Sequence, residues 1–188
     1  IYVQAGVYEE FSKKLAAAVE KLSIGDGLVD GVTTGPLINN DAVLTAEEHL
    51  EDALAKRGRV LTGGKAHALG GTFYEPTIVA DVTQEMMVAQ DEPFGPLAPL
   101  FKFDDEDEVI EMANDTIFGL ASYFYAKDLS RVYKVAEALE YGMVGINIGL
   151  ISTEVAPFGG VKQSGLGREG SHHGIEDYLE MKYLCMSV

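Results

Sequence analysis

Residues 120–148, LASYFYAKDLSRVYKVAEALEYGMVGINI, decide the fold class of this 188-residue chain. Two apolar, β-prone runs at 120–125 and 143–148 flank residues 129–139, in which apolar side chains recur at helical spacing. A strand, a helix of about ten residues and a second strand form a βαβ unit, whose two strands run parallel. The stretch therefore predicts an α/β fold.

The same alternation of strands and helices extends back to the start of the chain. Further strands are expected at 1–3, 59–62, 73–79 and 97–103. Further helices are expected from Val7 to Leu22 with one apolar stripe, from a cap at Asn40 or Asp41 to Gly58, and from Asp104 through Ala113. Repeated βαβ crossovers predict a largely parallel sheet with helices on both faces.

The last residues differ from this pattern. After a short helix expected near 169–178, the stretch 178–188 alternates well enough for a strand. A terminal strand that projects from a domain can complete a sheet in a partner subunit, and an edge strand of the chain's own sheet is the open alternative. We predict one domain over 1–177, an oligomerisation strand over 178–188, and a homo-oligomer, either a dimer or a tetramer.

Composition excludes several classes of partner. The chain has 14 Lys and Arg against 30 Asp and Glu, and its formal net charge of −16 repels nucleic acid and anionic membranes. No apolar run approaches the ~20 residues of a membrane span. The single cysteine, Cys185, rules out an internal disulfide framework and fits a reducing cytoplasm. The chain has neither a signal peptide nor an initiator Met, so we expect an excised piece of a longer cytoplasmic protein.

Three features that suggest chemistry fail on context. The stretch GLGREG at 165–170 matches G-x-G-x-x-G, but no hydrophobic strand precedes it and only 18 residues follow it, so its glycines are expected to serve turns. The four histidines lack metal-ligand spacing and are expected at the surface, so no metal site is predicted. Cys185 lies in a strand-like tail without a helix N-terminus or a base, and we expect it to be inert.

Two Gly- and Pro-containing clusters lie beside predicted strands, DEPFGP at 91–96 and APFGG at 156–160. Strand ends are where α/β proteins place their sites, although stiff connections alone would also explain the clusters. EPFGP at 92–96 resembles the E-x-F-G-P element of the aldehyde dehydrogenase superfamily. PFGGVKQSGLGRE at 157–169 resembles its P-F-G-G-x-K-x-S-G-x-G-R-E element. The resemblance covers essentially the whole chain, and within the superfamily the stretch at 149–152 and the ending at 174–183 most resemble succinate-semialdehyde dehydrogenases.

The resemblance implies a mechanism whose central groups lie outside these residues. In that family a cysteine thiolate attacks the aldehyde, hydride passes to NAD or NADP, and a glutamate activates the water that hydrolyses the thioester. The resemblance places the cysteine in a G-Q-x-C element just before the strand at 1–3, and it places the general base further upstream. No catalytic residue is therefore predicted in this chain, and the isolated chain is expected to be inactive.

Four residues match binding positions of the family. Glu92 matches the glutamate that accepts hydrogen bonds from the nicotinamide ribose hydroxyls, and Phe94 matches the aromatic residue beside the nicotinamide. Phe158 matches the aromatic residue that lines the aldehyde tunnel. Ser152 takes a position where semialdehyde enzymes use a serine to bind the distal carboxylate of the substrate, which a hydroxyl donor suits. A plain loop serine is the alternative for Ser152.

The sequence leaves two functions open. The first is that the intact protein oxidises succinic semialdehyde with NAD or NADP, with glutarate semialdehyde or another aldehyde as the alternative substrate. The second is a non-catalytic assembly module held by its terminal strand. A Gly-Gln-x-Cys sequence encoded just before Ile1 would favour the enzyme, and its absence would favour the module.

Overall fold

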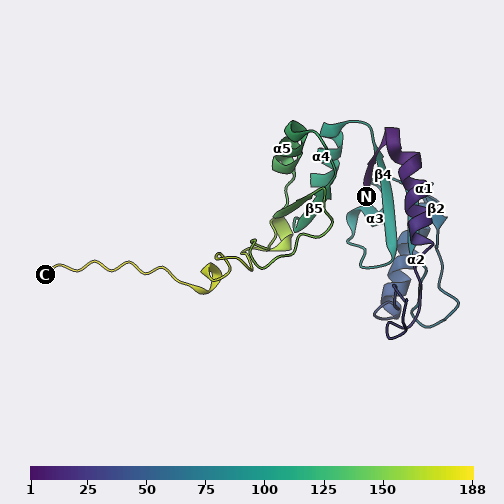
Figure 1. Ribbon diagram of the computed structural model, residues 1–188, viewed down its shortest axis with the longest axis horizontal. Coiled ribbons are helices and arrows are strands. Elements are labelled where there is room, and N and C mark those ends of the chain that lie inside the picture. The colour runs from purple at the N-terminus through teal and green to yellow at the C-terminus, as the bar shows by residue number, and fades with distance from the viewer. The chain divides into compact units, whose positions relative to one another are not determined.

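The computed structural model describes residues 1–188, which form two compact units, 1–109 and 110–188 (Figure 1). The boundary between the units falls inside helix α4, Glu106–Asn114. Whether residues 1–177 act as one domain in the intact protein stays a prediction. None of the helices combines the length and the apolar character that a membrane span requires.

The first unit is built on a four-stranded sheet in the order β1-β4-β3-β2. These strands are β1 (Tyr2–Gln4), β4 (Leu97–Phe103), β3 (Thr77–Val82) and β2 (Arg59–Thr62). Strand β4 runs parallel to both β1 and β3, and only the edge strand β2 runs antiparallel to its neighbour. The prediction of a largely parallel sheet is confirmed.

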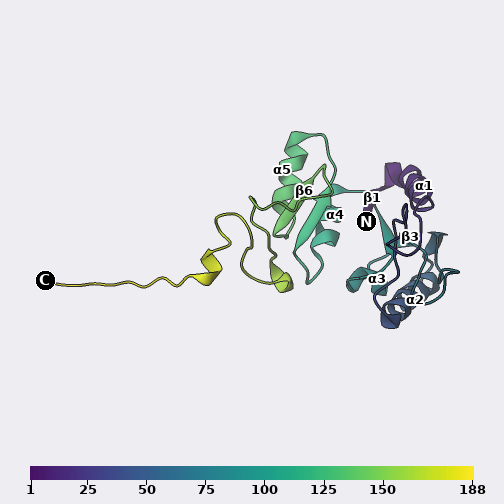
Figure 2. The same cartoon turned by 60° about the horizontal axis from the view of Figure 1, so that its bottom comes forward.

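Helices cover both faces of this sheet, as predicted. On one face Ile78 joins a cluster with α1 (Tyr8–Val19), and on the other its neighbour Val79 joins a cluster with Leu50 of α2 (Asn40–Ala55). Successive strand residues point to opposite faces, so the all-apolar run in β3 contributes to both cores. The short helix α3 (Met87–Gln90) lies on the α2 side, where its Val88 is buried. Figures 1 and 2 show α1 and α2 beside the strands.

Helix α1, Tyr8–Val19, follows a 3-10 turn and buries only part of the predicted stripe: Leu15 and Val19 pack against the core. Val7 is 53% exposed and Phe11 is 37% exposed, whereas Tyr8 and Ser12 are buried. The Tyr8 hydroxyl donates to a carbonyl of β4 and accepts an N–H of β3, and the Ser12 hydroxyl donates to the Tyr8 carbonyl at 2.7 Å. These bonds satisfy the polar groups, so the helix can turn them inward.

The structure corrects the cap predicted for α2. Asn39 is the N-cap residue, one position before the predicted candidates Asn40 and Asp41. Its backbone is extended, and its side-chain oxygen accepts the N–H of Ala42 at 2.9 Å. Three successive polar residues offered the same capping chemistry, and the backbone conformation selected the first.

The strand predicted at 73–79 begins and ends later in the structure, at residues 77 and 82. Strand β3 begins at Thr77, and before it Tyr74 makes only an isolated bridge with Ala66. Pro76 has no N–H to donate, so the ladder starts after it, where the N–H of Thr77 donates to the Pro96 carbonyl at 2.8 Å.

The second unit contains the βαβ motif on which the fold class was predicted. Strands β5 (Ala121–Phe124) and β6 (Met143–Ile146) are parallel neighbours joined by helix α5 (Leu129–Ala138). Figure 2 shows α5 beside the two strands. Asp128 caps α5 by accepting the N–H of Arg131 at 2.8 Å.

The C-terminal residues carry little regular structure. The helix predicted near 169–178 is reduced to turns and one 3-10 turn, Glu176–Tyr178. Residues 179–188 run as an exposed, extended segment that pairs with no strand of this chain (Figure 1). The alternative of an edge strand in the chain's own sheet is therefore wrong. An oligomerisation strand needs a partner subunit and stays a prediction.

Candidate functional site

The first candidate site is the tight turn between α3 and β4 in the first unit. The N–H of Phe94 donates to the Glu92 carbonyl at 3.0 Å, and the N–H of Gly95 donates to the Pro93 carbonyl at 2.8 Å. Each bond joins residues two positions apart, and together they make residues 92–95 a compact turn. The Phe94 ring is 84% exposed, and Glu92 is exposed with no ion pair at its carboxylate.

These two side chains fit a nicotinamide nucleotide. An ionised carboxylate only accepts hydrogen bonds, and its two oxygens can take the two hydroxyls of a ribose diol. An exposed aromatic ring two residues away offers a face on which a flat heterocycle can pack. Both groups are uncovered by the rest of their unit, so a ligand can reach them.

The second candidate site lies in the second unit, on the segment that follows β6. Ser152 is exposed, and no hydrogen bond engages its hydroxyl. Its neighbour Ile151 packs over β6, because a Cβ added at Gly145 would come within 3.0 Å of the Ile151 side chain. Phe158 is half-buried and forms an isolated bridge with Glu169, with reciprocal backbone bonds of 2.8 and 2.7 Å. The backbone at Phe158 is thus held by hydrogen bonds, and the residue before Ser152 packs against β6.

Polar residues of the motif at 157–169 bind backbone groups inside the motif and at Gly119. The Arg168 guanidinium donates to the carbonyls of Gly160 and Gly167 at 2.8 and 2.7 Å. The Ser164 hydroxyl accepts the N–H of Gly119 at 2.9 Å, at the start of the segment that leads into β5. The side chains that make the motif recognisable therefore fix the loop that carries Phe158.

The glycines of the motif serve backbone geometry. Gly165 and Gly167 have φ values of 107° and 81°, a left-handed region that favours glycine. A 3-10 turn, Lys162–Ser164, precedes them, where a dinucleotide fingerprint would follow a strand. The apparent G-x-G-x-x-G thus has the turn-forming role that its sequence context predicted.

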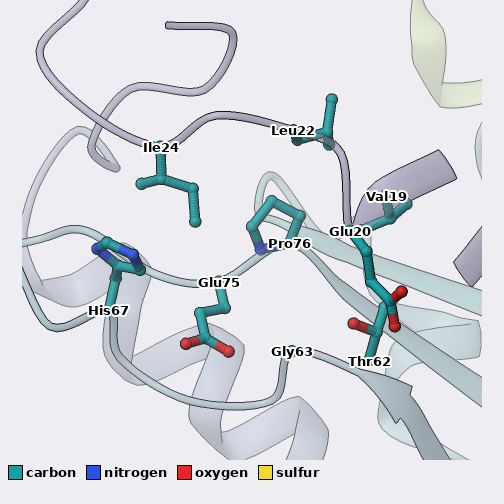
Figure 3. A pocket seen from close by; sticks show the side chains of 9 residues that line it. All are labelled: Val19, Glu20, Leu22, Ile24, Thr62, Gly63, His67, Glu75 and Pro76. Carbon is teal, nitrogen blue, oxygen red and sulfur yellow. The ribbon is translucent and has the colours of Figure 1, made fainter. Parts of the chain in front are cut away.

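A hollow of about 180 Å³ also lies in the first unit (Figure 3). Its wall combines apolar side chains such as Val19, Leu22 and Ile24 with the carboxylates of Glu20 and Glu75. None of the four predicted binding residues lines it. No three His, Cys, Asp or Glu side chains gather so that they could hold a metal ion.

The family model of the aldehyde dehydrogenase family matches residues 1–184 of the chain. The chain belongs to the aldehyde dehydrogenase family. It is 68% identical to glutarate-semialdehyde dehydrogenase of Pseudomonas aeruginosa, covering 99% of this chain and 38% of that protein. It is 64% identical to the NADP(+) succinate-semialdehyde dehydrogenase of Escherichia coli, over 100% of this chain and 39% of that protein.

A solved structure of the family gives the same fold. Succinate-semialdehyde dehydrogenase from Burkholderia pseudomallei superposes with a TM-score of 0.97 at 62% identity, covering 100% of this chain and 39% of that one. The chain therefore spans about 39% of the length of the relatives it matches. The likeness confirms the predicted family and α/β fold.

Sequence reasoning missed one contact beside the Glu92 turn of this aldehyde dehydrogenase chain. His49 was expected at the surface with the other histidines, yet it is buried and its Nε2 lies 3.3 Å from Oδ2 of Asp91. The signal was available, because His49 stands three residues after Ala46 and next to Leu50 on the buried side of α2. A histidine on an apolar stripe requires a polar partner, and that partner is 42 residues away in sequence.

Proposed function

We propose that this chain forms part of the cofactor- and substrate-binding wall of an NAD(P)-dependent dehydrogenase that oxidises succinic semialdehyde to its dicarboxylic acid. The observation that carries the proposal is an exposed, unengaged Ser152 in a chain that is 64% identical to a succinate-semialdehyde dehydrogenase. A hydroxyl at this position favours a substrate with a carboxylate at its far end.

In this proposal Glu92 and Phe94 position the nicotinamide half of the cofactor. The Glu92 carboxylate accepts hydrogen bonds from the two ribose hydroxyls, and the Phe94 ring restricts where the nicotinamide can lie. The bound cofactor supplies the hydride acceptor for aldehyde oxidation. The tight turn at 92–95 supports these roles because it holds both side chains on one short, exposed segment.

Ser152 and Phe158 act on the aldehyde. The Ser152 hydroxyl donates a hydrogen bond to the distal carboxylate, and the Phe158 ring packs against the carbon chain between the two ends. An aromatic residue in place of Ser152 would remove the donor and fill the space for the carboxylate. This arrangement favours ω-carboxy aldehydes over apolar ones.

Glutarate semialdehyde is the second candidate substrate. It has the same two functional groups with one more methylene, and a relative that is 68% identical carries that name. One methylene changes discrimination by roughly 10–200-fold. Comparing kcat/KM for the two semialdehydes therefore decides between them.

The remaining parts of the proposal concern the intact protein. The nucleophilic cysteine and the general base come from outside these 188 residues, and the isolated chain is inactive. The intact protein works in the cytoplasm as a homo-oligomer. The exposed segment 179–188 supports assembly, because Leu179, Met181 and Tyr183 are all more than half exposed in it. A partner's sheet would cover these side chains.

The substrate proposal is tested with Ser152→Ala and Ser152→Phe in the full-length protein. Loss of a hydrogen bond to a charged group costs about 1.5–3 kcal/mol, so kcat/KM for succinic semialdehyde should fall about 10–100-fold. Butanal has the same carbon chain without the carboxylate, and its kcat/KM should change little in Ser152→Ala. Ser130→Ala, an exposed serine on α5, is the matched control. Unchanged succinic semialdehyde kinetics in Ser152→Phe would refute the assignment.

A further inference from the structure

Helix α2 lies against the segment that leads into the Glu92 turn. Near the C-terminal end of α2, the Lys56 ammonium donates to the Glu85 carbonyl at 2.8 Å. One turn earlier, Oδ2 of Asp52 accepts the N–H of Met87, the first residue of α3, at 2.8 Å. The two contacts fix where α3 begins, five residues before Glu92.

The same face of α2 continues along this segment toward the turn itself. His49 reaches Asp91, the C-cap residue of α3, and a Cβ added at Gly95 would lie 4.0 Å from the Cβ of Ala46. Positions 46, 49, 52 and 56 are spaced by three or four residues, so they form one stripe along the helix. The stripe contacts the segment on both sides of Glu92.

His49 supplies the polar contact nearest to Glu92. Its side chain is only 4% exposed, whereas the Asp91 side chain is 58% exposed. Nε2 donates to the carboxylate, and Nδ1 is buried without a hydrogen-bond partner. The Asp91 carboxylate is therefore the single hydrogen-bond partner of a buried imidazole, and that carboxylate belongs to the residue before Glu92.

The turn itself has few other restraints on this side. The N–H of Asp91 donates to the Met87 carbonyl at 2.9 Å, and the Asp91 backbone is then extended. Within residues 92–95, the only backbone hydrogen bonds are the two donated by the N–H groups of Phe94 and Gly95. The direction in which Glu92 projects therefore depends on how Asp91 is held.

We propose that His49 is a positioning residue for the cofactor, which acts by holding Asp91 so that the Glu92 carboxylate projects toward the ribose. This inference rests on the proposed function, in which Glu92 binds the nicotinamide ribose. His49 itself touches neither cofactor nor substrate. When His49 is replaced, the turn still forms but adopts other orientations, in which the Glu92 carboxylate cannot accept both ribose hydroxyls. The affinity for the cofactor therefore falls.

The test uses the full-length protein and measures KM for NAD+ or NADP+, KM for the aldehyde, and kcat. His49→Leu removes the donor, and His49→Gln keeps an amide N–H near the same place. Because one hydrogen bond contributes roughly a threefold to tenfold effect, we expect His49→Leu to raise the cofactor KM by about that factor. His49→Gln should recover most of the loss, while the aldehyde KM stays near wild type in both. His67→Leu, in the same unit and not bonded to Asp91, is the control.

Asp91→Ala removes the same contact from its exposed side, so it tests the inference even where His49→Leu does not fold. We expect it to raise the cofactor KM as His49→Leu does, and the double variant to show no further rise. An unchanged cofactor KM in Asp91→Ala, or an equal rise in the cofactor and aldehyde KM values, overturns the inference.

Glu92→Gln separates the two levels of the proposal. A raised cofactor KM in Glu92→Gln with no effect of Asp91→Ala leaves the proposed function standing and overturns the role of His49. An unchanged cofactor KM in Glu92→Gln overturns the cofactor role of Glu92, and the inference about His49 with it.

Discussion

Gly142 lies just before β6, against the backbone of the loop that carries Phe158. A Cβ added to Gly142 would overlap the Gly159 carbonyl oxygen and come within 3.0 Å of the Gly160 Cα. Both obstacles are backbone atoms, which cannot rotate away as the end of a side chain can. Gly142→Ala should therefore push residues 158–160 away from the start of β6 and move Phe158.

The size of the effect follows from two opposing terms. Forcing extra atoms into a packed region costs about 1–3 kcal/mol. The backbone of Gly142 is not left-handed, so alanine there also gains about 0.4–1 kcal/mol by restricting the unfolded chain. The clash exceeds the gain, and we expect a net destabilisation of about 1–2 kcal/mol.

The assay combines thermal unfolding with steady-state kinetics on the full-length protein. Gly142→Ala should lower Tm and raise the aldehyde KM, because Phe158 moves, while the cofactor KM stays near wild type. Gly149→Ala is the matched control, since its nearest neighbour would be the Tyr125 hydroxyl at 3.8 Å, an ordinary contact. Equal Tm and aldehyde KM in the two variants would show that the Gly142 contact does not hold the loop.

Three further perturbations test local parts of the structure. Asn39→Ala removes the cap of α2 and should cost about 1 kcal/mol in denaturant unfolding, with Asn39→Ser close to wild type. The Lys56 ammonium, and then a backbone N–H, lower the pKa of Asp52 below its usual value. Asp52 thus contributes its full stabilisation above about pH 4 and loses it as pH falls through the lowered pKa. The difference in free energy of unfolding between wild type and Asp52→Asn should therefore narrow in acid. Asn147 has a φ of 58°, and its side-chain amide makes two hydrogen bonds with the backbone of Ala126. Both substitutions lose these bonds, but Asn147→Ala should destabilise more than Asn147→Gly, because glycine avoids the backbone strain.

The apolar pattern predicted where most elements lie but only part of the side of α1 that faces inward. Strands β2 and β4 have the predicted bounds: β4 is a largely apolar run with Leu97, Leu100 and Phe101 buried, and β2 pairs with β3 at the edge of the sheet. The predicted stripe fails at its start, because Val7 lies in the 3-10 turn before α1 and Phe11 is exposed. The buried side includes Ser12, which the pattern reads as polar, because a hydrogen bond to the helix backbone offsets the cost of burying its hydroxyl.

The candidate binding residues could be found from short motifs, but the contacts that hold them could not. Glu92 and Phe158 stand in short motifs that resemble those of the aldehyde dehydrogenase family, and it is this resemblance that implies their binding roles. The contact between His49 and Asp91 joins distant parts of the chain and leaves no local pattern. Whether residues 178–188 pair with a partner subunit stays a prediction, because one sequence does not specify a partner chain.

The most direct test of the central claim is a kinetic comparison on the wild-type, full-length protein. NAD(P)H formation is followed with succinic semialdehyde and with butanal, each with NAD+ and with NADP+. The account predicts turnover with at least one cofactor and a kcat/KM about 10-fold or more higher for succinic semialdehyde, as expected for a hydroxyl that binds its carboxylate. No turnover of succinic semialdehyde with either cofactor, or a preference for butanal, would contradict it.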